Sequence, residues 1–222
     1  MTTQNMLEYL KADTGNNPDF VIIWLHGLGA DGHDFEPVVP QFKNPTHTFR
    51  FIFPHAPVQP VTINGGMAMR AWYDITAMDI NRHVDEAGIN KSAQMVSALI
   101  DQQIKDGFKS EQIVLAGFSQ GGAMALHMAL TNHHKLAAVI ALSCYLPVPG
   151  VLNNQNKGTN KDTSFFMAHG QHDPVVPFAL GEQSKDLLIK AGFKVAWHHY
   201  PIQHGVDMNE LNDIKSFLLT LP

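Results

Sequence analysis

Short apolar runs bounded by turn residues recur along the chain, and each has the length of a strand buried on both faces. The clearest run is residues 20–25, Phe-Val-Ile-Ile-Trp-Leu. Six further runs predict strands at residues 6–10, 48–53, 113–116, 136–143, 164–168 and 194–200.

Between these runs the apolar spacing changes to that of helices. Residues 89–104 place apolar side chains on one side and predict an amphipathic helix. Further helices are predicted at residues 34–42, 123–130, 178–190 and 206–219, the first weakened by two prolines. Buried strands that alternate with helices predict an α/β protein with a mostly parallel sheet covered on both faces.

Two segments interrupt this alternation. Residues 54–88 have little periodicity, and so long an irregular stretch predicts a functional loop or lid. Residues 152–162 are rich in Asn, Lys, Gly and Thr and predict a solvated surface loop. Neither segment reads as a linker, and 222 residues suit one domain, so we expect a single domain over residues 1–222.

Composition limits the classes of binding partner and the cellular compartment that we expect for this protein. A net charge of −5 gives no reason to expect nucleic acid, and no apolar run approaches a membrane span, so stable membrane insertion is not expected. Cys144 is the single cysteine, which fits a reducing compartment. The first ten residues lack the pattern of a signal peptide. We therefore expect a cytoplasmic protein.

The strongest candidate chemistry lies between the predicted strand at 113–116 and the predicted helix at 123–130. Gly117-Phe118-Ser119-Gln120-Gly121 matches G-x-S-x-G, which occurs by chance in about one chain in ten of this length. The strand before it and the helix after it supply the context of a nucleophile elbow, a sharp turn that presents a serine at a helix N-terminus. Ser119 is thus the predicted nucleophile.

A serine nucleophile needs a base that takes its proton and an acid that orients the base. In elbow hydrolases these partners follow in the order serine, acid, histidine. Asp173 lies just after the predicted strand at 164–168, whereas Asp162 precedes that strand and Asp186 lies inside a helix. Among the later histidines, His204 lies in a loop after the last strand, so Ser119, Asp173 and His204 form the predicted triad.

The same chemistry requires N–H donors for a developing oxyanion. Gln120 supplies one backbone N–H as the residue after the nucleophile, and the loop at residues 26–29 is expected to supply the second. Thirteen histidines invite a metal interpretation, but the sequence has no H-E-x-x-H motif and no Cys/His cluster. We expect no metal and no cofactor.

Residues 60–75 contain more apolar side chains than a solvated loop needs. Part of this content is expected to be ordinary core, and Trp72 is the first candidate for that role. Unbranched, polarizable methionines adapt to chains of varied length. We predict substrate contacts at Met67, Met69, Trp72 and Ile75.

Together these motifs resemble the acyl-protein thioesterase, lysophospholipase and carboxylesterase family of the α/β-hydrolases. The resemblance covers nearly the whole chain and rests on Leu25-His-Gly-Leu-Gly29, Pro54-His-Ala-Pro57, Pro60-Val-Thr-Ile-Asn64, Ala71-Trp-Tyr-Asp-Ile75, the elbow through Gly122, Leu142-Ser-Cys-Tyr-Leu-Pro147 and His169-Gly-x-x-Asp173. It implies an α/β-hydrolase fold, the same triad, and Leu28 and Gln120 as oxyanion donors. It also implies that residues 60–75 help to shape an acyl-binding groove.

The predicted function is that of a serine hydrolase that cleaves carboxylic esters or thioesters through an acyl-enzyme intermediate. The alternative is a non-catalytic binder of acyl chains on the same fold. A serine peptidase is disfavoured because the chain has no large cap domain to select peptides. Thioesters, lysophospholipids and short esters all stay open as substrates, and a homodimer that covers an apolar groove is possible.

Overall fold

The computed structural model describes residues 6–76, 84–153 and 158–222. Its main sheet has seven strands, which in chain order are β1 (Tyr9–Asp13), β2 (Phe20–Leu25), β3 (Phe49–Pro54), β6 (Ile113–Phe118), β7 (Ala138–Leu142), β8 (Ser164–Gly170) and β9 (Lys194–Tyr200). In space the order is β1-β3-β2-β6-β7-β8-β9. β1 runs antiparallel to β3, and the other neighbours are parallel.

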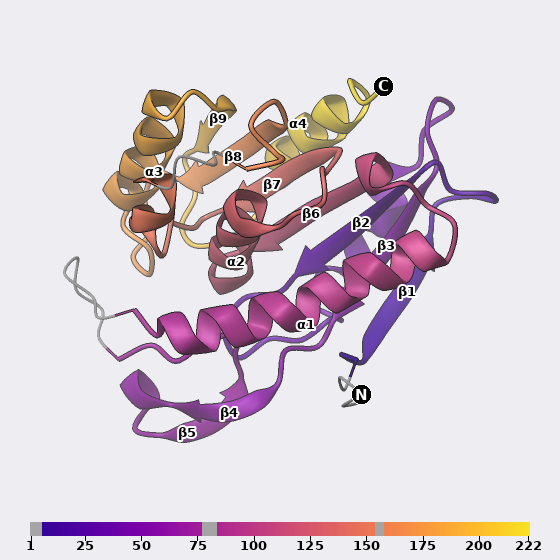
Figure 1. The fold of residues 1–222 in the computed structure, drawn as a ribbon. Helices are drawn as coiled ribbons and strands as arrows, with labels where there is room; N and C mark the ends of the chain where they lie inside the picture. The colour runs from indigo at the N-terminus through magenta and orange to yellow at the C-terminus, as the bar shows by residue number, and fades with distance from the viewer. Residues whose placement is uncertain (1–5, 77–83, 154–157) are drawn as a thin grey trace.

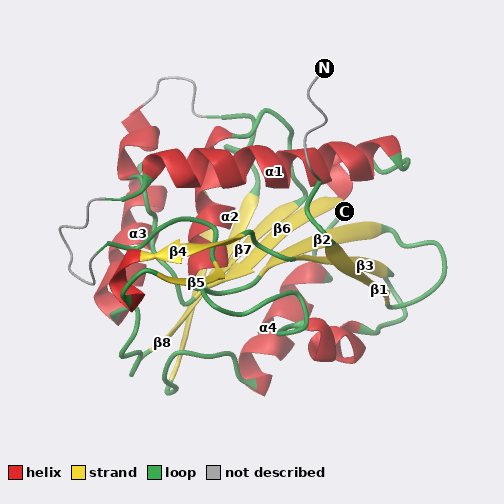
Figure 2. Ribbon diagram, turned by 90° about the horizontal axis from the view of Figure 1, so that it is seen from below, coloured by secondary structure: helices red, strands yellow, loops and turns green. Residues whose placement is uncertain are grey.

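Helices cover both faces of this sheet. One face carries α1 (Glu86–Lys105), α2 (Gln120–Thr131) and α3 (Phe178–Lys190), and the other carries α4 (Met208–Leu218) and the 3-10 helix η1 (Glu36–Phe42). Figure 1 shows α1 and α2 in front of the sheet, and the turned view in Figure 2 places α4 on the opposite side. The predicted α/β-hydrolase fold with a mostly parallel sheet is confirmed.

The alternation along the strands builds two hydrophobic cores. In β2, Val21, Ile23 and Leu25 pack with α1 and α2, whereas Ile22 and Trp24 pack with η1 and α4. Every residue of this strand is buried. A strand buried on both faces has no polar side, which is why it reads as a continuous apolar run in the sequence.

The strand order also creates the position of the site. From β2 the chain moves outward to β3, and it later returns to place β6 on the other side of β2. The loops that leave the carboxyl ends of β2 and β6 therefore diverge. A crevice at such a reversal of strand order is the usual binding site of an open α/β sheet.

Some predicted elements differ in extent. The first strand is Tyr9–Asp13 instead of residues 6–10, because this half-exposed edge strand alternates and gives no apolar run. The segment predicted as a weak helix is the 3-10 helix η1, which has Pro40 inside it. α1 begins at Glu86, three residues early, because Asp85 accepts a hydrogen bond from the Gly88 N–H at 2.9 Å and caps the helix.

The irregular segment after β3 contains a second, two-stranded sheet. β4 (Val58–Val61) and β5 (Met67–Arg70) pair antiparallel, joined through the 3-10 turn η2 (Thr62–Asn64). Gly65 and Gly66 turn the chain with φ of 68° and 76°, values that favour glycine. Figure 1 shows this hairpin below α1, away from the main sheet. Residues 77–83 of the irregular segment lie outside the described residues.

Two further short 3-10 helices, η3 (Ser110–Gln112) and η4 (Pro149–Asn153), precede β6 and follow β7. η4 overlaps the start of the predicted surface loop at 152–162, of which residues 154–157 lie outside the described residues. Across the part of the chain that is described, no helix combines the length and apolar character needed to span a membrane.

Candidate active site

Ser119 lies in a strained turn between β6 and α2. Its φ of 55° and ψ of −119° are unusual for a residue with a side chain, and it stands directly before the first residue of α2. Its N–H donates to the Leu142 carbonyl at 2.8 Å, and its carbonyl accepts from the Ala123 N–H at 3.0 Å. The turn is therefore fixed by β7 on one side and by the first turn of α2 on the other.

Glycines allow this turn to pack closely. A Cβ on Gly117 would overlap the carbonyl of Gly121, and a Cβ on Gly121 would overlap the carbonyl of Leu25. At Gly122 a Cβ would lie 2.9 Å from Cys144 Sγ. The backbone of α2 thus approaches β2 and β6 more closely than any larger residue permits.

The predicted base and acid lie next to this serine. His204 Nε2 is 3.0 Å from Ser119 Oγ, and His204 Nδ1 is 2.6 Å from Asp173 Oδ2. The His204 side chain is 16% exposed and the Asp173 side chain is fully buried. A proton on Nδ1 that is donated to Asp173 leaves the Nε2 lone pair directed at the serine hydroxyl, which is the arrangement that a general base requires.

The other contacts of Asp173 keep it ionised. Its Oδ1 accepts hydrogen bonds from the N–H groups of Val175 and Val176, each at 2.8 Å, and His169 Nε2 lies 3.4 Å from Oδ2. Burial alone would raise the pKa of this carboxyl, but these hydrogen bonds and that of His204 together lower the pKa far below its ordinary value. Asp173 is therefore a carboxylate at neutral pH.

The loops that carry the acid and the base are tied together. The N–H groups of Gln171 and His172 donate to the carbonyls of Tyr200 and Ile202 at 2.8 and 3.0 Å. A Cβ on Gly170 would overlap the Gln203 carbonyl, so the end of β8 touches the chain just before His204. The separation of the two side chains is thus set by backbone contacts.

Two backbone N–H groups are available beside Ser119. Neither the Leu28 N–H nor the Gln120 N–H donates to a protein acceptor among the described residues. Both residues line the same pocket as Ser119. Gln120 stands at the N-terminus of α2, where the helix dipole also favours negative charge. These N–H groups can receive an oxyanion.

His26 fixes the loop that holds Leu28. The Ala56 N–H donates to His26 Nε2 at 3.0 Å, so the ring proton must be on Nδ1, which lies 2.7 Å from the Gly27 carbonyl oxygen. Burial lowers the pKa of His26 to about 4, despite that carbonyl contact. A neutral His26 therefore joins the loop after β2 to the segment that follows β3.

The Gln120 side chain fixes the other donor. Its Oε1 accepts from the Trp72 N–H and its Nε2 donates to the Tyr73 carbonyl, both at 2.8 Å. The Trp72 indole in turn donates to the His26 carbonyl at 2.9 Å. Both candidate oxyanion donors are thus held by one network that includes Trp72.

A largely apolar pocket of about 270 Å³ opens beside Ser119. Its walls come from the loop after β2, the turn η2 of the hairpin, the segment after β5, the elbow, the loop after β7 and the acid loop. The described lining residues are Leu28, Ile63, Asn64, Tyr73, Ile75, Ser119, Gln120, Tyr145, Val175 and Val176. The pocket is closed in part and adjoins the nucleophile.

The four residues predicted to contact substrate do not all lie at the pocket. Ile75 lines the pocket, whereas Met67, Met69 and Trp72 lie outside its lining. Met67 is 64% exposed on the hairpin, and Met69 Sδ accepts a hydrogen bond from Asn64. Trp72 is fully buried, so its predicted substrate contact is corrected to a supporting role in the core.

Sequence reasoning missed most of the pocket wall. Val175 and Val176 carried a usable signal, since two apolar residues directly follow the predicted acid and its proline. Ile63 and Tyr73 lie in the apolar stretch at residues 60–75, but nothing in the sequence distinguished them from its core residues. Tyr145 carried no signal, because its approach to the site depends on the tertiary fold.

Comparison with known proteins identifies the family. The sequence matches the family described as Phospholipase/Carboxylesterase over residues 12–221. The chain belongs to this family. It is therefore a hydrolase of the carboxylesterase and acyl-protein thioesterase type, and the predicted enzyme class is confirmed.

Named relatives agree with this assignment. Acyl-protein thioesterase 1 of Neurospora crassa is 42% identical over 207 residues, which cover 89% of this chain and 84% of the relative. Acyl-protein thioesterase 1 of Cryptococcus neoformans is 35% identical and covers 96% and 97% of the two chains. Among solved structures, SOBER1 of Arabidopsis thaliana has a TM-score of 0.83 at 32% identity and covers 90% of this chain and 97% of its own.

Proposed function

We propose that this hydrolase cleaves acyl esters and acyl thioesters through a covalent intermediate on Ser119, with His204 as general base and Asp173 as the residue that orients it. The 3.0 Å approach of His204 Nε2 to Ser119 Oγ supports this proposal most directly. The 2.6 Å contact on the other ring nitrogen adds to it, because it fixes the tautomer that leaves Nε2 basic.

In the first half of the reaction, His204 takes the Ser119 proton as Oγ attacks the acyl carbon. The carbonyl oxygen becomes an oxyanion and accepts hydrogen bonds from the N–H groups of Leu28 and Gln120, and each such donor contributes about 3–4 kcal/mol in comparable enzymes. The ionised Asp173 stabilises the imidazolium that forms. His204 then gives its proton to the leaving alcohol or thiol, and the acyl group stays on Ser119.

In the second half, water takes the place of the leaving group. His204 removes a proton from this water as the water attacks the acyl carbon, and the same two N–H groups stabilise the second oxyanion. The bond between the acyl carbon and Ser119 Oγ then breaks, His204 returns its proton to Oγ, and the free acid leaves. The exposed side of His204 gives water its access, since 16% of that side chain reaches solvent.

The pocket indicates the acyl part of the substrate. Its wall of Ile63, Ile75 and Val176 offers no charged partner, so it suits a hydrocarbon chain. A volume of about 270 Å³ lies just below the usual range for small-molecule sites. We infer that acyl chains of medium length fill this pocket best. The leaving group, which is the part that differs between thioesters, lysophospholipids and simple esters, stays outside the pocket.

The cytoplasmic location and the homodimer stay separate predictions. Cys144 is buried and burial raises the pKa of its thiol, so it is a poor redox or disulfide partner, in line with a reducing compartment. Light scattering on the purified chain checks the homodimer directly.

A fluorophosphonate probe tests the covalent mechanism. We expect the wild type to gain one probe, mapped to Ser119, and the Ser119→Ala variant to gain none. Ser143→Ala is a matched control, since Ser143 also follows the end of a strand and has a positive φ, of 46°, but is buried. It should label like the wild type. Labelling at another residue, or none in folded wild type, would refute the proposed nucleophile.

A further inference from the structure

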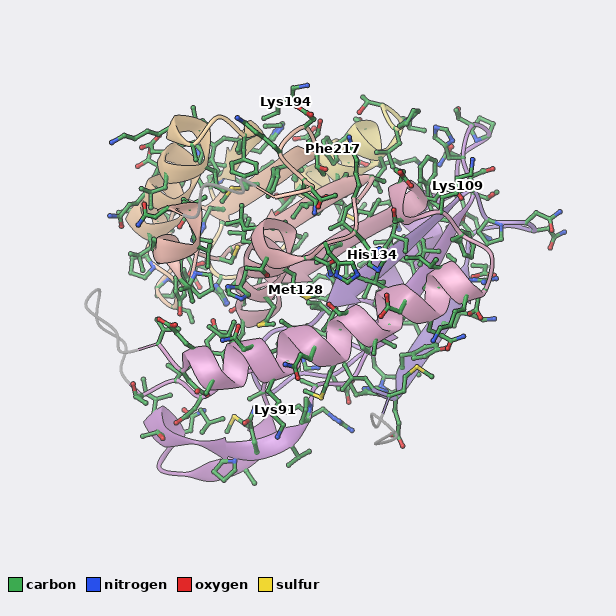
Figure 3. The ribbon with its side chains drawn as sticks, in the orientation of Figure 1. Lys91, Lys109, Met128, His134, Lys194 and Phe217 are labelled. Atoms are coloured by element: carbon green, nitrogen blue, oxygen red, sulfur yellow. The ribbon has the colours of Figure 1, made fainter. Side chains whose placement is uncertain are left out.

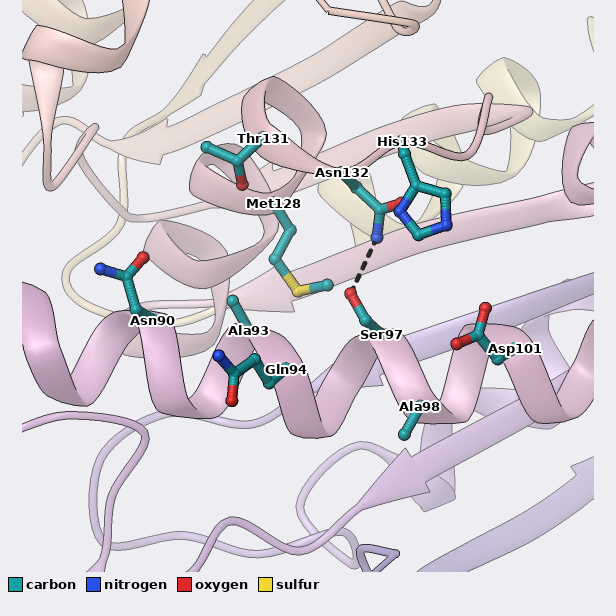
Figure 4. Close-up of a pocket in the computed structure, with 10 residues that line it drawn as sticks. All are labelled: Asn90, Ala93, Gln94, Ser97, Ala98, Asp101, Met128, Thr131, Asn132 and His133. Carbon is teal, nitrogen blue, oxygen red and sulfur yellow. Dashed lines mark hydrogen bonds between the residues drawn. The ribbon is translucent and has the colours of Figure 1, made fainter. Parts of the chain in front are cut away.

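A second polar cluster lies at the far end of α2 from Ser119. It combines Asp101 of α1 with His133 and His134, which follow α2 in the turn toward β7. Asp101 and His133 help to line a separate pocket of about 550 Å³ (Figure 4). A helix of 12 residues is about 18 Å long, so this cluster is remote from the candidate triad.

We propose that Asp101, His133 and His134 form a binding site for a late first-row transition ion, with zinc as the best representative. One ligand atom from each of the three side chains lies within 4.8 Å of the others. Two imidazoles and one carboxylate are a common ligand set for zinc, and imidazole also suits nickel and copper. The sequence alone showed no such cluster because Asp101 lies about thirty positions before the adjacent His133 and His134.

The ligands are close to their metal-bound positions. His134 Nε2 lies 2.7 Å from Asp101 Oδ1, and the rings of His133 and His134 have centroids 4.0 Å apart. Ligand atoms of tetrahedral zinc are about 3.3 Å apart, given bonds of about 2.0 Å. Binding therefore needs side-chain shifts of about an ångström, within reach of the exposed His133 ring.

The turn that carries the histidines is held on both sides. Asn132 accepts a hydrogen bond from the His134 N–H at 2.8 Å and donates to Ser97 of α1 at 3.1 Å, the contact drawn in Figure 4. From the other side, the buried Asn160 donates to the His134 carbonyl at 3.0 Å. Figure 3 shows His134 over α1. This support reduces the conformational entropy that the ligands would lose on binding.

Electrostatics favour a cation at this place. The C-terminal end of a helix carries partial negative charge, and the last turn of α2 has no basic residue to offset it. The Asp101 carboxylate adds a full charge. Three protein ligands leave at least one coordination position for water. The ion would thus link α1 to the end of α2 without contact with the candidate triad.

Zinc titration of the whole chain tests the site. We expect one zinc to bind, to raise Tm, and to be replaced by cobalt with an absorption band typical of tetrahedral coordination. Magnesium and calcium should leave Tm unchanged because they prefer oxygen ligands. His133→Ala and Asp101→Asn should each lower the affinity for zinc at least tenfold. Neither side chain is buried, so both variants should fold.

His199→Ala is the matched control. His198 and His199 are also two adjacent histidines, and they lie in β9. Neighbouring strand residues point to opposite faces, so this pair cannot converge on one ion. The control should bind zinc like the wild type. Absent binding, or equal loss in His199→Ala and His133→Ala, would overturn the proposal. Ester hydrolysis by metal-free protein tests the catalytic proposal separately, since removal of zinc should lower Tm and leave kcat unchanged.

Discussion

The two halves of the candidate active site are built in different ways. The catalytic half consists of Ser119, Asp173 and His204, held by backbone close contacts and by hydrogen bonds of 2.6 to 3.0 Å. The acyl pocket is a set of apolar side chains from separate segments, with Ile63 and Ile75 on one wall and Val176 on another. A hydrogen bond weakens steeply when its atoms are displaced. The free energy gained from apolar contact is instead roughly proportional to the apolar area that is buried, so it changes gradually.

This difference predicts two kinds of response to substitution. Changes in the catalytic half should act on every substrate equally, because all substrates share the same reacting carbonyl. Changes in the acyl pocket should depend on the length of the acyl chain. The predictions below test this division, from the largest expected effect to the smallest.

The largest effect should come from loss of the nucleophile. Ser119→Ala removes the attacking oxygen, and we expect kcat to fall by about three orders of magnitude or more for short and long acyl esters alike. Steady-state hydrolysis of nitrophenyl esters measures this, with circular dichroism as the check on folding. A folded variant that retains a tenth of the wild-type kcat would contradict the role of Ser119.

The next effect concerns the backbone around the serine. Gly121→Ala places a Cβ against the Leu25 carbonyl, and neither β2 nor α2 can move without disturbing the sheet. We expect the free energy of unfolding to fall by about 3 kcal/mol, at the upper end for overpacked sites. Chemical denaturation measures the loss.

Gly205→Ala is the control for that experiment. Gly205 adjoins His204, yet a Cβ there meets no atom within 4 Å. This variant should keep its stability to within about 0.5 kcal/mol, as most surface substitutions do. Equal losses in the two variants would mean that close packing does not distinguish the elbow from the histidine loop.

A pH effect should come from His26, which holds the oxyanion loop. Burial lowers the pKa of His26 to about 4, so between pH 6.5 and 4 the unfolded chain binds a proton that the folded chain does not. This contribution to stability is present above pH 6.5 and is lost as the pH falls, by up to about 3 kcal/mol. Chemical denaturation at several pH values in this range measures the slope of the free energy of unfolding against pH.

His26→Gln should flatten that slope, because glutamine cannot titrate but can still accept the Ala56 N–H. His33→Gln is the control from the same loop, since the His33 side chain is 64% exposed. It should leave the slope unchanged. An unaltered slope in His26→Gln would place the acid sensitivity elsewhere.

The two halves also differ in how far the sequence predicts them. Gly117 and Gly121 leave a motif because close backbone packing excludes other residues, and the chain order of Asp173 and His204 follows from the order of the strands. The pocket wall has no such constraint, since any apolar side chain of suitable size serves. Apolar content at residues 60–75 therefore did not distinguish buried Trp72 from pocket-lining Ile75.

The same reasoning explains the errors in the fold. Buried strands such as β2 stand out as apolar runs, but β4 has two exposed residues and a proline, and β5 is half exposed. A hairpin of this composition has no strong pattern. The polar cluster at Asp101, His133 and His134 was missed because its ligands come from separate segments.

The smallest and most selective effect should come from the pocket wall. If the acyl chain lies against Ile75, each buried CH₂ contributes up to about 0.8 kcal/mol, and kcat/KM should rise from acetyl to medium-chain esters. Ile75→Ala removes part of that contact and should lower kcat/KM for an octanoyl ester about tenfold while acetyl-ester turnover stays within twofold. Met67→Ala is the control, because Met67 is 64% exposed and lies outside the pocket lining. It should keep the wild-type dependence on chain length. If Ile75→Ala instead lowers both esters equally, the wall belongs to the catalytic half, and the division between the two halves fails.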